Sequence, residues 1–355
     1  FSWQGPKNYS PLACGKNMTR KLKILFAINR FYLGGAERLV INEIKHLNKD
    51  IFDPWLATLL KETSVSIADE VPLGPDRFVK FNFGGPKSGL FDILSWIKLC
   101  RFMKKNKFDA VLSNLFLANM VVRIAAWIAK VPVIIAHEPN AIPNRSRWQI
   151  IVDRFLAKRT DKIMVSSYKL AEDLSAQEKI PKEKFLVNYN SPTLTSISLN
   201  AEKIREIKNN FSLSPDSFII TGVGRLIEQK GFIYLIEAAA EVLKNNPGSK
   251  IYFLIFGKGV LENELRGRIN QLNLNERILL PGLAPMENIM ALTDIFVMPE
   301  LYDGLALAIL EAMSVGKPVI VSKVSGPDEV IEDNVNGLFV EPKNVSGLAE
   351  KILQL

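Results

Sequence analysis

Two acids eight residues apart are the first candidates for chemistry in this sequence. Asp303 and Glu311 occur in DGLALAILEAMSVGKP, where the residues between them form an apolar helix pattern that the following glycine and proline end. On one helix the two carboxylates would lie about 12 Å apart along the axis and about 80° apart around it. The helix start would also offer an anion three backbone N–H groups, those of Gly304, Leu305 and Ala306. The spacing predicts a site for an elongated anionic ligand, with an internal ion pair of Glu311 as the structural alternative.

Two cations follow a second apolar run, in the segment GVGRLIEQKG that begins at Gly222. The segment contains the GxG of a dinucleotide fingerprint, ending at Gly224, but position 227 is Ile where that fingerprint needs a third glycine. Arg225 and Lys230 stand five residues apart near a predicted helix start. Arginine offers a planar fork and lysine a point charge, a combination that suits a diphosphate. A solvated charged loop is the alternative.

Two further positions follow strands in the first half of the chain. Gly34 and Gly35 come after the apolar run KILFAIN and open a helix pattern, so they could bring backbone N–H groups close to a phosphate or simply form a tight turn. His137 ends the run VPVIIA. A histidine at a strand end can bind a substrate or transfer a proton, although it could also be a satisfied loop residue.

These residues need a scaffold, and the pattern of short apolar runs alternating with helix patterns predicts parallel βαβ units. The alternation breaks near residues 188–199, which are rich in Asn, Ser, Thr and Pro, and then restarts. We therefore expect an extension at 1–20, a Rossmann-like domain at 21–190, a linker at 191–210 and a second domain of this kind at 211–355. Because the sequence ends inside a helix pattern, we expect the second domain to lack its terminal segment. Ligands bind at the carboxyl ends of such sheets, so the two domains would face each other across a cleft.

Composition narrows the class of protein. The 355 residues are 48% hydrophobic and 23% charged, as in globular proteins, and no apolar run reaches the length of a membrane span. The two cysteines, Cys14 and Cys100, fit neither a disulfide framework nor a zinc ribbon. Lys and Arg exceed Asp and Glu by 13 in residues 1–200 and fall 5 short in residues 201–355. The basic first half and acidic second half indicate domains with different partners, although drift in surface composition is the alternative. Basic residues are not interleaved with stacking aromatics, so nucleic-acid binding is not expected.

From about Lys23 onward the sequence resembles glycosyltransferase family 4, the retaining, nucleotide-sugar-dependent group 1 enzymes of the GT-B fold. The resemblance rests on Gly222–Gly231, on Pro299–Ile320, and on the segments FGKGVLENEL, LLPGLAP and LTDIFVMPE. It implies a metal-independent hexosyltransferase with a UDP or GDP sugar as donor and no further cofactor. It also implies that the domain at 21–190 is on the acceptor side and that the domain at 211–355 binds the nucleotide sugar. No Asp-x-Asp metal motif is present. The GGAER form of the first glycine loop is common where the acceptor is a lipid-linked or cell-envelope saccharide.

The resemblance also implies roles for the candidate residues. Asp303 would contact the transferred sugar, Glu311 the ribose hydroxyls, and His137 the C6 side of the sugar, where it would assist catalysis. Arg225 and Lys230 would hold the diphosphate, and the leaving phosphate would act as base, so no protein nucleophile is expected. The remaining donor-binding positions are glycines and backbone groups: Gly34, Gly35, Gly224, Gly257, Gly304, Leu305 and Ala306. Asp303 departs from the family's glutamate by one methylene, which we expect to alter sugar preference or weaken activity.

One helix pattern suggests a membrane partner. Ile97–Lys107 mixes apolar residues with five Lys and Arg, as an interfacial helix on an anionic membrane does, and a plain surface helix is the alternative. We therefore expect a cytoplasmic protein at the inner face of the cytoplasmic membrane. Two other functions stay open at this point, a non-catalytic nucleotide-sugar binder and an NAD-dependent oxidoreductase.

Overall fold

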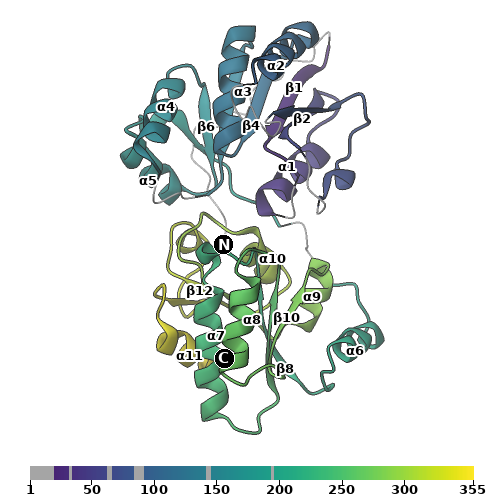
Figure 1. The fold of residues 1–355 in the computed structure, drawn as a ribbon, viewed down its shortest axis with the longest axis vertical. Coiled ribbons are helices and arrows are strands. Elements are labelled where there is room, and N and C mark those ends of the chain that lie inside the picture. The colour runs from purple at the N-terminus through teal and green to yellow at the C-terminus, as the bar shows by residue number, and fades with distance from the viewer. Residues whose placement is uncertain (1–19, 32–33, 62–65, 84–91, 141–144, 193–195) are drawn as a thin grey trace.

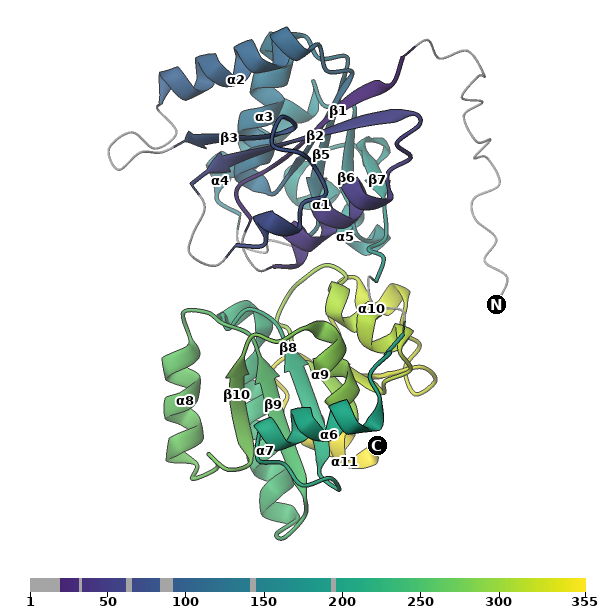
Figure 2. The same ribbon diagram turned by 90° about the vertical axis from the view of Figure 1, so that its right-hand side faces the viewer.

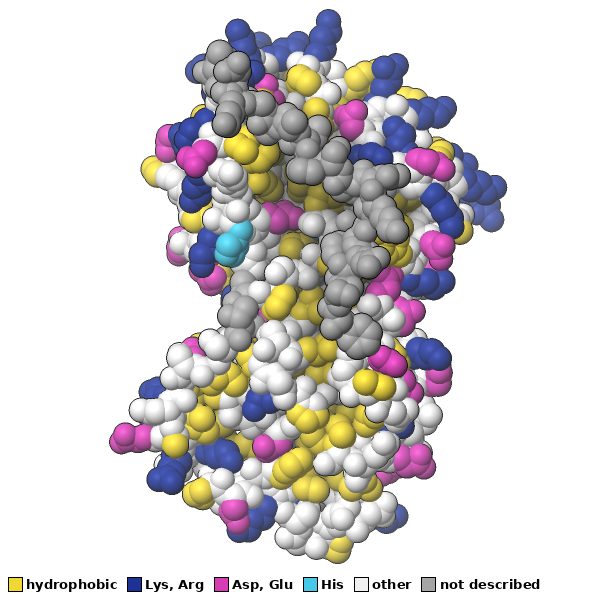
Figure 3. All heavy atoms as spheres, turned by 180° about the vertical axis from the view of Figure 1, so that it is seen from behind, with side chains coloured by type: hydrophobic (Ala, Val, Ile, Leu, Met, Phe, Trp, Pro, Cys, Tyr) yellow, Lys and Arg dark blue, Asp and Glu magenta, His cyan; other side chains and the backbone are white. Residues whose placement is uncertain are grey.

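The computed structural model describes residues 20–31, 34–61, 66–83, 92–140, 145–192 and 196–355, which form two α/β domains stacked along the long axis of the molecule (Figure 1). Of the predicted extension, residues 1–19 lie outside the described ranges. Arg20 forms an ion pair with Asp109 at 2.6 Å. Figure 3 shows the molecule narrowing between the domains, with Lys and Arg side chains around the outline of the N-terminal domain.

The N-terminal domain is built on a parallel sheet, and its described strands have the order β3-β2-β1-β4-β5-β6-β7. The strands are β1 Leu22–Ile28, β2 Phe52–Leu60, β3 Phe78–Phe83, β4 Ala110–Asn114, β5 Val133–Glu138, β6 Lys162–Val165 and β7 Phe185–Val187. The helices are α1 Gly35–His46, α2 Ile93–Asn106, α3 Phe116–Ala129, α4 Arg147–Ala157 and α5 Tyr168–Glu178. The strand order reverses between β1 and β4, which is where an open α/β sheet opens a crevice for a ligand.

Two cores cover the two faces of this sheet. One face buries alternate β1 residues such as Leu25 against α2 and α3, and the other buries Phe26 and its neighbours against α1. Successive residues of β1 thus point to opposite faces, and both faces are apolar because parallel sheets are covered on both sides. Helices α2, α3, α4 and α5 pack in turn against one another.

The C-terminal domain repeats this architecture in the order β10-β9-β8-β11-β12-β13 among its described strands. The strands are β8 Phe218–Val223, β9 Ile251–Phe256, β10 Ile278–Gly282, β11 Ile295–Met298, β12 Val319–Ser322 and β13 Leu338–Val340. The helices are α6 Ala201–Asn210, α7 Phe232–Asn245, α8 Glu262–Gln271, α9 Met286–Leu292, α10 Leu307–Ser314 and α11 Val345–Gln354. The carboxyl ends of β8, β9 and β10 point toward the N-terminal domain (Figure 2).

The structure corrects the prediction that Asp303 begins a helix. Helix α10 begins at Leu307, and Asp303 lies in the loop between β11 and α10. In a helix that began at Asp303, Leu305 O would accept from Ile309 N–H; it accepts instead from Asn190 Nδ2 at 2.6 Å, and Ile309 N–H donates to Ala306 O at 3.1 Å. The predicted arrangement of both acids on one helix is therefore wrong, although the loop still places Asp303 at a sheet edge.

Three other elements differ from the sequence-based expectation. The stretch 191–210, predicted to be a linker, contains helix α6, which packs against α9. Strands β3 and β7 were not predicted. The first is a half-exposed strand at the edge of the sheet, and the second, at the other edge, has three residues, so neither shows the continuous apolar run of a central strand.

Helix α2 contains the predicted membrane segment Ile97–Lys107 except for Lys107, which caps the end of the helix. Leu99 and Met103 of this segment are buried in the core of the domain, and Phe102 packs against Trp55. The exposed side of the helix therefore carries cations together with three apolar residues, Ile93, Leu94 and Ile97. Among the described residues no helix combines the length and the apolar character needed to cross a bilayer.

Candidate functional site

The two domains meet where the loops after β5 and β6 contact the loop after β11. A side chain at Gly304 would place its Cβ 2.3 Å from Pro139 O and 2.5 Å from Ser166 Oγ, so only glycine permits this approach. Leu305 N–H donates to Ser166 Oγ at 3.4 Å, which joins the two domains directly. The carboxyl ends of both sheets thus come together, as an active-site cleft between two such domains requires.

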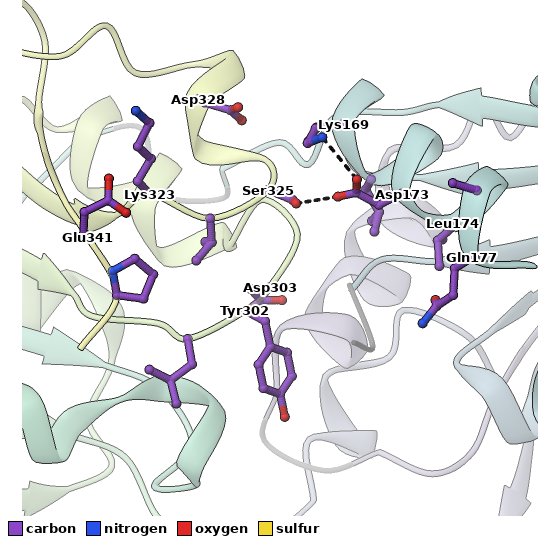
Figure 4. A pocket seen from close by; sticks show the side chains of 15 residues that line it. Lys169, Asp173, Leu174, Gln177, Tyr302, Asp303, Lys323, Ser325, Asp328 and Glu341 are labelled. Carbon is purple, nitrogen blue, oxygen red and sulfur yellow. Dashed lines mark hydrogen bonds and ion pairs between the residues drawn. The ribbon is translucent and has the colours of Figure 1, made fainter. Parts of the chain in front are cut away.

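A cavity of about 760 Å³ opens beside this junction. Helix α5 contributes Lys169, Asp173 and Gln177 from one domain, and Tyr302 and Asp303 line the cavity from the other (Figure 4). Ser325 donates to the Asp173 carboxylate at 2.7 Å across the domain boundary. The cavity therefore depends on how the two domains are set against each other.

Three charged side chains form a buried cluster at the end of β11. Lys230 Nζ donates to Asp303 Oδ2 at 2.6 Å and also to Glu300 Oε1. The side chain of Lys230 is 11% exposed, that of Asp303 6% and that of Glu300 1%. The segments after two neighbouring strands, β8 and β11, supply the cation and the acids, so the reversal of strand order in this sheet brings them together.

This cluster holds two carboxylates for one cation. Burial raises the pKa of Glu300 to about 8, and although Lys230 opposes this shift, the Asp303 carboxylate reinforces it. Burial also disfavours the charged form of Asp303, but Lys230 outweighs it and holds the pKa of Asp303 below its ordinary value. A protonated Glu300 that donates a hydrogen bond to the Asp303 carboxylate accounts for both the raised pKa of Glu300 and the lowered pKa of Asp303. At neutral pH we expect the cluster to consist of an ammonium, a carboxylate and a neutral acid.

Arg225 and Lys230, predicted to hold one diphosphate together, lie in different surroundings. Lys230 is enclosed in the cluster, whereas Arg225 follows β8 with an exposed side chain. Beside them, Gly224 and Gly257 end β8 and β9 in direct contact, and a Cβ at Gly257 would lie 1.8 Å from Gly224 O. Glycine at this position lets the two strand ends meet beneath the Arg225 loop.

His137 lies at the end of β5, fully buried rather than open to a cleft. Its Nδ1 is 2.8 Å from Asn114 Oδ1 at the end of β4, and 3.9 Å from Glu43 Oε1 of α1. Because an amide oxygen only accepts, Nδ1 carries the proton and Nε2 presents a lone pair. Within the described ranges Nε2 and both Glu43 oxygens have no hydrogen-bond partner.

The charge state of this second group follows from its burial. Burial lowers the pKa of His137 to about 4 and raises that of Glu43 to about 7. The imidazole is therefore neutral at physiological pH and can accept a hydrogen bond from a hydroxyl group through Nε2. This chemistry suits a sugar hydroxyl better than a phosphate.

A buried ion-pair network supports the strand that carries His137. Arg145 forms an ion pair with Glu138 at 2.7 Å, and it also pairs with Asp153 at 2.5 Å and with Glu178. Asp153 in turn pairs with Arg123 of α3. The network ties the end of β5 to three helices, which fixes the backbone at His137.

The other predicted positions are found at the same edges. Gly34 caps the start of α1, Gly35 is the first residue of that helix, and Glu311 is buried on α10. The predicted free N–H groups are only partly available: Gly304 N–H interacts with Asp303, and Leu305 N–H with Ser166. Ala306 is the residue that caps α10.

Sequence reasoning missed three polar residues of these groups. Glu300 stands two residues after an apolar strand, and Asn114 ends one, so an acid or amide at the end of a buried run was the available signal. Glu43 lies within an amphipathic helix and gave no such signal. In the described parts of the chain no three His, Cys, Asp or Glu side chains are grouped so that they could hold a metal ion.

Two family models match this chain, one described as Glycosyltransferase Family 4 over residues 33–191 and one as Glycosyl transferases group 1 over residues 203–355. The chain belongs to the group 1 glycosyltransferases of the GT-B fold. This membership confirms the fold class and the family expected from the sequence, and it does not support the oxidoreductase alternative.

Individual relatives of this glycosyltransferase span nearly the whole chain. It is 28% identical over 352 residues to the UDP-Gal:alpha-D-GlcNAc-diphosphoundecaprenol alpha-1,3-galactosyltransferase of Escherichia coli, covering 96% of this chain and 89% of the relative. It is 26% identical over 312 residues to the putative glycosyltransferase EpsF of Bacillus subtilis, covering 85% and 79%. The structure of Anabaena HepE with UDP and glucose matches with a TM-score of 0.79 at 23% identity, covering 94% and 89% of the two chains.

Proposed function

We propose that this glycosyltransferase transfers a hexose, with retention of configuration and without a metal ion, from UDP to a hydroxyl of a lipid-linked or cell-envelope saccharide. The observation that carries the proposal is the junction at which the Asp303 loop meets the ends of β5 and β6. The named substrates of the E. coli relative, UDP-Gal and a diphosphoundecaprenol-linked sugar, favour UDP over GDP as the donor nucleotide and a lipid-linked acceptor.

In this proposal the chain's charges act on the departing diphosphate. The bond between sugar C1 and the β-phosphate oxygen breaks, a bond from C1 to the acceptor oxygen forms on the same face, and the acceptor proton passes to the leaving phosphate. Arg225 stabilises the negative charge that grows on the leaving diphosphate. Lys230 contributes less, because Glu300 and Asp303 lie beside it and share its charge. Asp303 and His137 Nε2 orient sugar hydroxyls, and Glu311 binds the ribose.

The membrane expectation stays part of the proposal. An acceptor on a lipid carrier requires the cleft to work at a bilayer surface, and the exposed cations of Ile97–Lys107 would favour the anionic inner face of the cytoplasmic membrane.

The experiment begins with donor binding. Thermal unfolding is measured with UDP-, GDP-, ADP- and dTDP-sugars and with NAD, because saturation at about 100 times Kd stabilises by about 2.7 kcal/mol. We expect a shift with UDP-sugars that Arg225→Ala removes and Arg205→Ala, an exposed change on α6, retains. Transfer to a diphosphate-linked N-acetylglucosaminyl lipid is then measured in EDTA, and the anomeric configuration of the product is determined by NMR. Donor binding without transfer to any saccharide would instead support a non-catalytic binder, and a shift with NAD alone would refute the proposal.

A further inference from the structure

A row of large apolar side chains is exposed on helix α4 of the N-terminal domain. Trp148, Ile151 and Phe155 follow the spacing i, i+3, i+7 of one helix face and are 53%, 63% and 56% exposed. The neighbouring end of α3 adds Trp127 and Ile128, 43% and 50% exposed. Single exposed apolar residues are ordinary, but five on two adjacent helices form a surface that calls for a partner. These five residues are called the α3–α4 patch below.

Contacts at both ends hold the two helices of the patch side by side. At one end the Trp148 ring packs edge-on against Phe116 of α3, with ring centroids 5.5 Å apart. At the other end the Arg159 guanidinium, which follows α4, lies 5.2 Å from the centre of the Trp127 ring. The exposed residues thus lie along one face of a packed helix pair.

Buried contacts on the opposite side of α4 fix the orientation of the helix, so its apolar row faces solvent. Asp153 is buried between Arg123 and Arg145, and Leu156 and Ala157 are buried beside it. A capping box at Ser146 fixes the start of the helix. Rotating α4 to hide its apolar row would expose these ion pairs, so the row is a fixed feature of the fold.

The exposed charges on the two helices and on the residues directly flanking them are positive; the next acid along the chain, Asp161, accepts from Ile134 N–H at 2.7 Å. Exposed cations flank it at both helix ends: Lys130, Arg147, Lys158 and Arg159. Residues 116–130 and 145–160 contain a single acid, Asp153, and that acid is buried on the inner side. Apolar side chains within a border of cations match an anionic lipid surface, where the apolar groups enter the interface and the cations meet lipid phosphates.

We infer that the α3–α4 patch is a docking surface for an anionic lipid bilayer. A second copy of this chain fits less well, because a two-fold contact would set these cations against their own equivalents. The inference concerns a surface other than Ile97–Lys107 and does not depend on the proposed transfer reaction. It places the membrane against the helices that cover one face of the N-terminal sheet.

The test is sedimentation of the full chain with vesicles of phosphatidylcholine alone or mixed with phosphatidylglycerol. The patch variant is Trp148→Ser/Ile151→Ser/Phe155→Ser, and its matched control is Val260→Ser/Val335→Ser, two apolar positions 88% and 71% exposed on the C-terminal domain. We expect wild type and control to bind the anionic vesicles, less so at high salt, and the patch variant to lose more than tenfold in partitioning. Arg147→Ala/Lys158→Ala, which leaves the apolar row intact, should lose about fivefold per cation. Circular dichroism and the thermal unfolding midpoint report whether each variant is folded.

Four results would overturn the inference. The first is that the wild type does not bind anionic vesicles, and the second is that it binds neutral vesicles equally well. The third is that both the patch variant and the cation variant bind as the wild type does. The fourth is that the wild type is a dimer, that the patch substitutions dissociate it, and that no form of the protein binds lipid. Loss of binding only in Lys98→Ala/Arg101→Ala would assign the contact to α2 instead.

Discussion

Replacing Glu300 by glutamine should change how the stability of the C-terminal domain depends on pH. Glu300 is 1% exposed and shares Lys230 with Asp303, so two acids compete for one cation in a site closed to water. Burial raises the pKa of Glu300 to about 8, and the proton it keeps at neutral pH fits a hydrogen bond to Asp303. Glutamine has nearly the same shape and also carries a hydrogen-bond donor, but it never ionises.

The magnitude follows from proton linkage. An unfolded glutamic acid releases its proton near pH 4.3, whereas folded Glu300 releases it near pH 8, so between these values the folded state binds one proton more. The free energy of unfolding therefore falls by about 1.4 kcal/mol per pH unit in this window, and the loss stops once the folded group ionises. From pH 6 to pH 9 this one group costs the wild type about 2–3 kcal/mol, a loss that the glutamine variant avoids.

Urea unfolding of wild type and Glu300→Gln at pH 6 and pH 9, with the signal of each domain's transition resolved, measures this difference. Other shifted groups, including His137 and Glu43, are shared by both proteins and cancel in the comparison. Glu350→Gln, an exposed acid on α11, is the control and should follow the wild type. Equal pH dependence of wild type and Glu300→Gln, or a glutamine variant that is less stable at both pH values by the same amount, would refute the assignment of the proton.

Two further substitutions test the domain junction and its support. Arg145→Met should lower the free energy of unfolding by about 3–5 kcal/mol, because it strands buried carboxylates that include Glu138, and chemical denaturation measures the loss. A stability change under 1 kcal/mol would contradict this account. Gly304→Ala should separate the loop from Pro139 O and so reduce transfer far more than it reduces UDP binding; equal loss of both, or loss of neither, would count against the junction as the site.

The fold was predictable where elements were buried on both sides. The runs at β1, β5 and β8 are almost wholly apolar, and the helix patterns between them are amphipathic, so alternation alone indicated two doubly wound domains. Edge strands gave weaker signals: β3 exposes Lys80 and other residues to solvent, and β7 is too short to show a pattern. The predicted start of α10 was wrong because a tertiary contact occupies a carbonyl group that a longer helix would use, as at Leu305, whose O accepts from Asn190 Nδ2.

Much of the candidate site was predictable for a related reason, since Gly224, Arg225, His137 and Asp303 all follow buried strands and parallel strands deliver their ends to one edge. The contacts between those residues could not be predicted from the sequence. That Lys230 would be enclosed depends on the segments after β8 and β11 approaching each other, and strand order is a property of the whole sheet. The residues near one strand end do not indicate which other strand ends lie beside it in the sheet.

The charge balance of the donor site follows from this enclosure. A lysine that faces two acids, one of them ionised, adds little net positive potential, so a diphosphate gains less from Lys230 than from a lysine without partners. In the proposed reaction Arg225, which is exposed and not part of the cluster, would then supply the larger share of the attraction. The acids in turn hold Lys230 and the Asp303 loop in one arrangement, and that loop carries Gly304, the point at which the two domains touch. On this reasoning the cluster positions the sugar end of the site, while the charge that stabilises the leaving group comes from the Arg225 loop.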